Sequence, residues 1–173
     1  MGARLETERL LLRWLTVDDL VVFNELGSNP EIIRYLGNRP FASLDVARET
    51  LTSAPLKDYA TYGYGRFACV WKQTGQVIGL CGPKFLPDAG EVDLGYRFLP
   101  SFWGMGLATE SALVVIDYAR HELGLRRLVG WVHPDNVASA HVLTKLGFSF
   151  ERKTAWADIP GVDFDLYAKR LDG

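Results

Sequence analysis

The sequence contains little cysteine and histidine, and it has no long apolar run. Of its 173 residues, two are cysteines (Cys69 and Cys81) and three are histidines. Their spacing matches no metal-ligand pattern, so we expect no metal. No apolar segment approaches the roughly 20 residues of a membrane span, and the first residues lack a basic-then-apolar leader pattern. We therefore expect a cytoplasmic protein that does not bind membranes and whose cysteines are small buried side chains.

The charge balance and the missing nucleotide motifs exclude further classes of protein. A formal net charge of −2 gives no general attraction to phosphate backbones, so we expect no nucleic-acid partner. The chain lacks G-x-x-x-x-G-K-[ST], which excludes a nucleoside-triphosphate P-loop. It also lacks internal repeats and linker-like stretches, and its length suits one domain, 1–173.

Residues 100–109 (PSFWGMGLAT) have the pattern of a phosphate-binding turn. A β-like stretch at 91–99 precedes them, and apolar or small residues at helical spacing follow from 107 to 123. A strand, a glycine turn and a helix in this order direct backbone N–H groups and the positive end of a helix dipole at one point. Side chains at Gly104 and Gly106 would keep a ligand's oxygens from the backbone. The pattern predicts a pyrophosphate site, and a simple tight turn is the alternative.

Helix-capping residues divide much of the remaining chain. Side chains suited to an N-cap stand at Thr16, Asn29, Ser43 and at Asp135 or Asn136. Thr16 also begins a capping-box spacing, and a proline directly follows Asn29. These residues predict three short helices before the main sheet and one helix near the end of the chain.

The periodicity of the apolar residues assigns the elements between these signals. Gly27 and Pro55 are expected to end the first and third helices, and Ile159-Pro160-Gly161 to form the last turn. The expected order is a strand at 5–15, helices at 17–26, 30–36 and 44–52, strands at 65–71, 76–82 and 91–99, a helix at 107–123, a strand at 126–133, a helix to 146, and strands at 148–157 and 162–171. This order predicts an α/β (α+β) fold with a largely antiparallel sheet.

Five segments, in order, resemble one family over nearly the whole chain. They are TERLLLR, GQVIGLCG, EVDLGYRFLPSFWGMGLATES, HPDNVASAHVLTKLGF and DFDLYAKRL. The chain is similar to the GCN5-related N-acetyltransferases (GNAT), and more closely to their RimJ/RimL-type branch. The resemblance implies a single-domain GNAT fold: a mixed, mostly antiparallel sheet of about seven strands, splayed between strands 4 and 5 and flanked by helices. It also implies acetyl-CoA as cosubstrate and direct acetyl transfer to a primary amine in a ternary complex.

The resemblance also implies which residues bind the cofactor. The family's Gln/Arg-x-x-Gly-x-Gly/Ala turn falls on 103–108, where Trp103 replaces Gln or Arg. This departure changes little, because the phosphate contacts come from main-chain N–H groups. The implied turn residues are Trp103, Gly104, Met105, Gly106, Leu107, Ala108 and Thr109.

The pantetheine arm of the cofactor lies, in this family, in the gap between the fourth and fifth strands. There it pairs with backbone like an added strand, which implicates Arg97, Phe98 and Leu99. A backbone N–H near Phe98 would polarise the thioester carbonyl. Asn136 and Ser139 at the following helix start are also expected to contact the cofactor.

The catalytic residues are expected beside the thioester. A lysine amine is almost wholly protonated at pH 7, whereas an α-amine is partly free, so a modest base suffices for an N terminus. Asp93 is the preferred base and Glu91 its alternative, with Asp158 on a later strand as a further one. Many relatives use a tyrosine as the acid seven residues after the motif asparagine, but Leu143 stands there. Ser139 is therefore the expected proton donor.

Several alternatives stay open from the residues alone. His133, at a strand end, and His141, inside a helix, are disfavoured bases. The missing tyrosine would also suit a CoA-binding sensor without turnover, and a nucleotide-binding domain of another kind is a third reading. No acidic cluster occurs at 32–41 or 56–64, which favours a peptide N terminus or a small neutral-bodied amine over a polyamine. A monomer and a homodimer are both compatible with the sequence.

Overall fold

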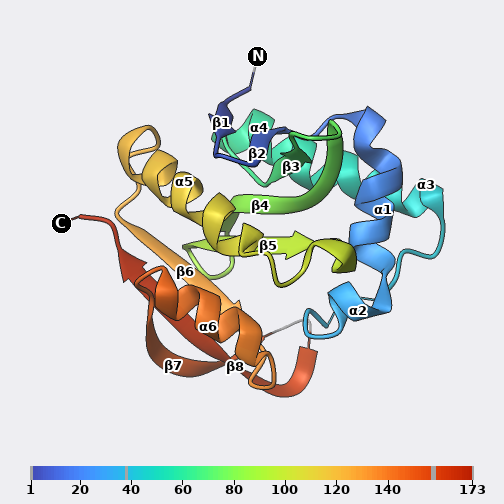
Figure 1. The fold of residues 1–173 in the computed structure, drawn as a ribbon. Helices are drawn as coiled ribbons and strands as arrows, with labels where there is room; N and C mark the ends of the chain where they lie inside the picture. The colour runs from blue at the N-terminus through green and yellow to red at the C-terminus, as the bar shows by residue number, and fades with distance from the viewer. Residues whose placement is uncertain (1, 38, 157–158, 173) are drawn as a thin grey trace.

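A computed structural model describes residues 2–37, 39–156 and 159–172. One eight-stranded sheet forms the centre of these residues (Figure 1), with the strand order β1-β2-β3-β4-β5-β6-β8-β7. In chain order the strands are β1 (Arg4–Glu6), β2 (Leu10–Trp14), β3 (Phe67–Trp71), β4 (Gln76–Leu86), β5 (Glu91–Phe98), β6 (Arg127–Val132), β7 (Ser149–Trp156) and β8 (Ile159–Arg170).

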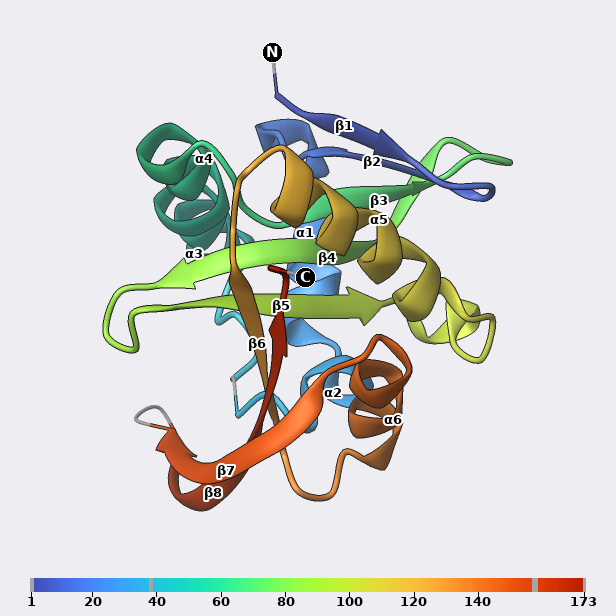
Figure 2. The ribbon, with the colours of Figure 1, turned by 90° about the vertical axis from the view of Figure 1, so that its left-hand side faces the viewer.

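The sheet opens between β5 and β6. These two strands are parallel and share one register pair, Asp93 with Val129, whereas every other neighbouring pair is antiparallel. Beyond that pair β6 turns away from β5 (Figure 2). The mixed, mostly antiparallel sheet and its splay between the fourth and fifth expected strands are thereby confirmed. The splay leaves the last part of β5 with β4 as its one strand neighbour.

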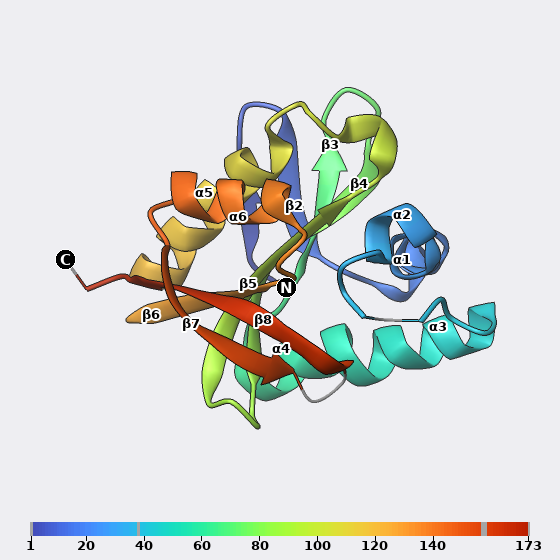
Figure 3. The ribbon, with the colours of Figure 1, turned by 90° about the horizontal axis from the view of Figure 1, so that it is seen from below.

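Helices cover both faces of the sheet (Figure 3). One face carries α5 (Leu107–His121) and α6 (Val137–Lys145). The other carries α1 (Leu20–Ser28), α2 (Pro30–Ile33), α3 (Leu44–Leu51) and α4 (Lys57–Tyr62). The short helical segments η1 (Val17–Asp19), η2 (Thr52–Leu56) and η3 (Pro100–Phe102) connect these elements. Among the described residues, no helix is both long and apolar enough to cross a membrane.

Two apolar clusters hold these layers together. Val115 and Ala119 of α5 and Leu143 of α6 pack against the sheet in the first cluster. Leu26 of α1 and Leu51 of α3 pack on the opposite face in the second. Burying each large apolar side chain stabilises the fold by roughly 1.5–3 kcal/mol. The sheet is therefore fixed from both sides, and the gap beside β5 lies in a rigid frame.

The expected helix starts are confirmed. The Asp19 carboxylate accepts the Thr16 N–H at 2.9 Å, completing a capping box. The side chains of Asn29, Ser43 and Asn136 each accept a backbone N–H two or three residues later, at 2.9, 3.2 and 3.2 Å. Each helix start on this list rests on a local side-chain bond, which is why the sequence pattern found it.

The single strand expected at 5–15 is wrong, because β1 and β2 form a hairpin there. The Thr7 N–H donates to the Leu10 carbonyl and the Leu10 N–H to Thr7 Oγ1, both at 2.9 Å. The register then pairs Leu5 with Leu12. This extra turn raises the strand count to eight.

One of the two expected helix-ending residues, Gly27, is wrong, and the strand expected to end at 82 continues to Leu86. Gly27 lies inside α1, and a Cβ there would come within 2.3 Å of the Phe41 ring, so this glycine serves packing rather than termination. The third helix ends before Pro55 as expected, because α3 stops at Leu51 and Pro55 lies in the π-type segment η2, which continues into α4. Pro83 belongs to β4, beyond the point where Cys81 pairs with Phe67 at the end of β3, so its missing N–H faces no strand.

The tripeptide expected to form the last turn lies in a strand instead. Strand β7 ends at Trp156 and β8 begins at Ile159, so Ile159-Pro160-Gly161 belongs to β8. The hairpin itself, with the two strands antiparallel, is confirmed.

Candidate active site

The glycine turn has the backbone expected of a phosphate site. Gly104 and Gly106 have φ of 75° and 77°, which L side chains rarely adopt. A Cβ at Gly104 would meet no atom within 4 Å, so the space in front of it is open to a ligand. Within the described residues, the backbone N–H groups of 104–109 donate no hydrogen bond, while Glu110 N–H already bonds the Gly106 carbonyl. Six donors at the start of α5 are thus available to an anion.

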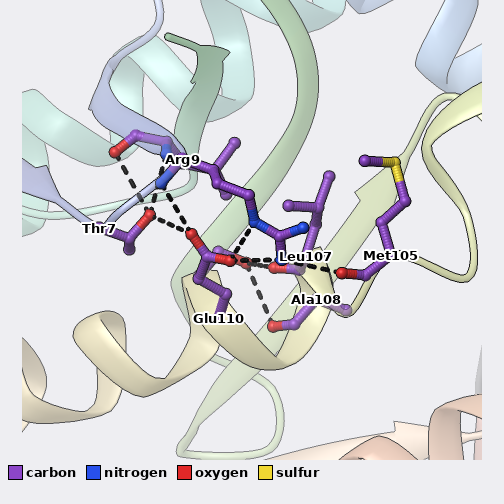
Figure 4. A network of polar contacts seen from close by, with 8 residues as sticks. Thr7, Arg9, Met105, Leu107, Ala108 and Glu110 are labelled. Carbon is purple, nitrogen blue, oxygen red and sulfur yellow. Dashed lines mark hydrogen bonds and ion pairs between the residues drawn. The ribbon is translucent and has the colours of Figure 1, made fainter.

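A polar network fixes this turn to the first hairpin (Figure 4). The Glu110 carboxylate accepts from Thr7 Oγ1 (2.7 Å), Arg9 N–H (3.0 Å) and Arg9 Nε (2.8 Å). Arg9 Nη2 donates to the Met105 carbonyl at 2.8 Å. Burial acts to raise the pKa of Glu110, but the bonds from Thr7 and Arg9 outweigh it and hold the pKa below its usual value. Arg9 therefore fixes the position of the Met105 carbonyl in the turn.

The end of β5 presents an unpaired backbone edge. Leu99 N–H donates to the Ile78 carbonyl of β4 at 2.9 Å. Because successive residues of a strand point their backbone groups to opposite sides, Arg97 also faces β4, and Tyr96 and Phe98 face the gap toward β6. Trp103 Nε1 donates to the Phe98 carbonyl at 2.7 Å. Of the three residues expected to pair with pantetheine, Phe98 is the one whose backbone faces the gap.

The start of α6 brings a serine and a tyrosine together. Asn136 Oδ1 accepts the Ser139 N–H at 3.2 Å. The Tyr96 hydroxyl donates to the Ser139 carbonyl at 3.1 Å and lies 3.0 Å from Ser139 Oγ. Burial raises the pKa of Tyr96 well above its usual value, so the phenol stays protonated. Leu143, which replaces the family's tyrosine, is buried against Gly130 of β6.

One cavity of about 1290 Å³ connects these features. It is lined by Asp93, Arg97, Phe98, Trp103, Gly104, Gly106, Leu107, Ala108, Thr109, Asn136 and Ser139 among the expected site residues. Glu91, Leu99 and Met105 do not line it. The structure thus gathers most of the expected residues around one space that spans both faces of the sheet.

The two expected bases lie in different ion pairs. The Asp93 carboxylate contacts the Arg66 guanidinium and is mostly buried. Glu91 pairs with Arg127 at 3.1 Å, and Arg127 also contacts Glu151. Asp93 therefore stands at the cavity, whereas Glu91 lies in an ion-pair cluster away from it. Asp158 lies outside the described residues.

His133 lines the cavity as well. Its Nδ1 accepts the Asp135 N–H at 3.1 Å, so in the neutral ring the proton lies on Nε2, which is then a donor and not a base. Its ring packs against Tyr35, with centroids 5.4 Å apart, and against Phe164 at 5.6 Å. This geometry favours a role in shaping the cavity.

Sequence reasoning missed two side chains of the site. Tyr96 and Arg97 alternate along β5 toward opposite faces, and both line the cavity. Tyr96 precedes Phe98 by two residues, so the same alternation that assigned the open edge could have placed its side chain on the α6 side. For Arg97 the sequence implied a role of the backbone only, although its side chain is the part that reaches the cavity.

A family model matches residues 9–149, with the description "Acetyltransferase (GNAT) domain". An uncharacterized N-acetyltransferase, p20, of Bacillus licheniformis is 34% identical over 149 residues, covering 85% of this chain and 83% of the relative. A spermidine N(1)-acetyltransferase of Escherichia coli K12 is 28% identical over 144 residues, covering 81% and 73%. A RimL ribosomal L7/L12 α-N-protein acetyltransferase, solved with coenzyme A, superposes with a TM-score of 0.81 at 20% identity, over 98% of this chain and 99% of that one.

Proposed function

Because the chain belongs to the GNAT family of acetyltransferases, we propose that it transfers the acetyl group of acetyl-CoA directly to a primary amine. The observation that supports this most is that two sets of unpaired backbone N–H donors lie around the same space. The unpaired N–H groups of 104–109 and the open edge at Tyr96 and Phe98 border one cavity. A diphosphate and an extended amide-containing arm are the ligand parts that such donors suit.

The residues of the cavity then have separate roles in the transfer. The turn binds the diphosphate, and the Phe98 N–H, which faces the gap, stabilises negative charge on the thioester oxygen as the amine nitrogen attacks its carbon. Asp93 accepts the proton that leaves the nitrogen, directly or through water. The carbon–sulfur bond breaks, and Ser139 donates the proton that the sulfur receives. Tyr96 is a positioning residue, because its hydroxyl lies 3.0 Å from Ser139 Oγ.

The reaction balances without a further reactant. A neutral amine loses one proton from nitrogen, and the departing sulfur gains one, so Asp93 and Ser139 return to their starting states through solvent. Burial keeps the Tyr96 phenol protonated, so it continues to hold Ser139 over the whole neutral range. The protein is expected to act in the cytoplasm, as a monomer or homodimer.

The test measures thiol release from acetyl-CoA across a panel of peptides and small amines. We expect amine-dependent release and no acetylated protein by mass spectrometry. Ser139→Ala should lower kcat by roughly 100-fold, and Tyr96→Phe by roughly tenfold, with little change in the Kd of CoA.

Other outcomes would identify the alternatives. CoA binding without release for any amine would indicate a sensor. Displacement of CoA by NAD or ATP would indicate a different nucleotide site, and an acetylated protein intermediate would exclude direct transfer.

A further inference from the structure

The cavity carries more positive than negative side chains. Six lysines and arginines line it, against the two carboxylates of Glu31 and Asp93. Lys145 is the one of the six on α6. The others, Arg34, Arg39, Arg66, Lys84 and Arg97, belong to β4, β5 and the chain before them, including α2 and its C-terminal flank.

Two of these five cations already have carboxylate partners. Arg66 contacts Asp93, and Lys84 Nζ lies 3.3 Å from Asp58 Oδ2. The Asp93 carboxylate therefore already has a cationic partner, Arg66, and Glu31 is exposed at the first turn of α2. The remaining three arginines form no ion pair with a described residue.

Arg97 is the most unusual of the three. Its side chain lies on the sheet face that carries α1, where Nη1 donates to the Leu26 carbonyl at a long 3.4 Å. Burial, and then the charge of Arg66, lower the pKa of Arg97 to about 10. The negative C-terminal end of the α1 dipole offsets only a part of the Arg97 charge. A guanidinium has five N–H donors and suits a carboxylate in a two-bond fork. Arg97 lines the cavity, and one of its donors has a partner among the described residues.

Arg34 and Arg39 extend the positive region to the rim. Both are exposed, and Arg34 lies over the Tyr35 ring, 5.1 Å from its centroid. Tyr35 packs against His133 of the segment after β6, which holds α2 beside the open side of the sheet. Arg34, Arg39 and Arg97 thus line the same cavity.

We propose that the acetyl acceptor is a primary amine that also carries an anionic group, a carboxylate, which Arg97 binds while the amine faces the thioester. The inference rests on the proposed function and deepens it. It replaces the neutral-bodied amine expected from the sequence, and it disfavours polyamines, because a polycation would meet three unpaired arginines. The carboxylate can come from a small amino acid or from an acidic residue next to a peptide N terminus.

The experiment compares matched amines that differ in one negative charge. One arm uses 4-aminobutyrate against 4-aminobutyramide, and the other uses amidated peptides that begin Ala-Asp against Ala-Asn, with spermidine as a polycation. In one of the two arms, we expect the anionic amine to have a kcat/KM at least tenfold higher than its neutral counterpart. The arm that shows this difference identifies the source of the carboxylate. Spermidine should be the poorest substrate.

Variants assign the preference to the arginines. Arg97→Gln should bring the anionic-to-neutral ratio close to one, mostly through the KM of the anionic amine. Arg34→Gln combined with Arg39→Gln should lower the ratio in part, and serves if Arg97→Gln unfolds. Arg48→Gln, on the exposed side of α3 and outside the cavity, is the matched control and should keep the ratio.

Two results would overturn the inference. One is equal or faster acetylation of the neutral members or of spermidine, and the other is a ratio that survives both arginine variants. If no amine stimulates thiol release, the proposed function fails first, and this outcome is distinct from release without charge preference.

Discussion

Gly104 and Gly106 show how single residues permit the proposed cofactor site. Their left-handed backbone turns successive N–H groups toward one point, and the absence of a side chain leaves that point open. Gly90, in the β4–β5 loop, has a similar φ of 64° and also faces open space. The two environments differ in that Gly104 lines the cavity and Gly90 does not.

We therefore expect Gly104→Ala and Gly90→Ala to have equal effects on stability and different effects on binding. Each substitution places an alanine at positive φ, which should lower the free energy of unfolding by about 1–2 kcal/mol in urea titrations. Gly104→Ala alone should raise the Kd of CoA by at least tenfold in calorimetry, because its methyl group occupies the phosphate space. Equal CoA affinity in both variants would argue against a diphosphate at this turn.

At the scale of elements, the β1–β2 hairpin supports the start of α5 through one carboxylate. Glu110 has 19% of its side-chain surface exposed and binds both Thr7 and Arg9. Hydrogen bonds to a buried charge contribute about 1.5–3 kcal/mol each when intact. The hairpin thereby orders a turn that lies about 100 residues away in the chain.

Glu110→Gln should lower the free energy of unfolding by about 1–2 kcal/mol at pH 7. The folded-state pKa of Glu110 is lowered, so its contribution is complete above the unfolded pKa of 4.5 and is lost as pH falls through the folded value. The difference between wild type and variant should therefore shrink below pH 4 in urea titrations. Asp45→Asn, in an exposed ion pair of α3, should change stability by less than about 0.5 kcal/mol at any pH.

The open edge of β5 makes a second prediction at this scale. Amides of Tyr96 and Phe98 face the gap, whereas Leu99 already bonds Ile78 and Arg97 faces β4. CoA should slow hydrogen exchange at Tyr96 and Phe98, because the pantetheine arm pairs with them, and leave Arg97 and Leu99 nearly unchanged. Uniform protection along 96–99 would instead indicate general stiffening without strand-like pairing.

Local signals predicted much of this fold, and tertiary contacts account for the exceptions. Thr16, Asn29, Ser43 and Asn136 were found because an N-cap bond lies within three residues of its cap. The role of Gly27 could not be predicted, because it depends on Phe41, fourteen residues away, whose ring fills the space that a Cβ at Gly27 would occupy.

The same distinction applies to the candidate site. The turn glycines could be predicted from their local spacing. The Tyr96–Ser139 contact joins residues 43 apart and needs the fold. The free charge of Arg97 depends on which carboxylates lie near it, and a sequence does not show that.

At the scale of the whole molecule, the sheet consists of two halves that meet at one register pair, Asp93 with Val129. A ligand in the gap contacts both halves, so binding should stabilise the entire fold. At 100 times its Kd, CoA should add about 2.7 kcal/mol and raise Tm by roughly 5–10 °C for a chain of this size. Pantetheine, which lacks the diphosphate, should give less than about a third of this shift at the same concentration. Equal Tm shifts for CoA and pantetheine in thermal scans would indicate that the pantetheine arm, and not the diphosphate at the glycine turn, supplies the binding energy.

The strand order β6-β8-β7 has a consequence for synthesis on the ribosome. β8 lies between β6 and β7, and it is the last of the described strands to leave the exit tunnel. Until residues 159–170 emerge, β6 lacks its antiparallel neighbour β8. The strand across the gap from β5 is then not held in the sheet on its other side. A nascent chain therefore completes the gap beside β5 only after residues 159–170 have emerged, however early the glycine turn has folded.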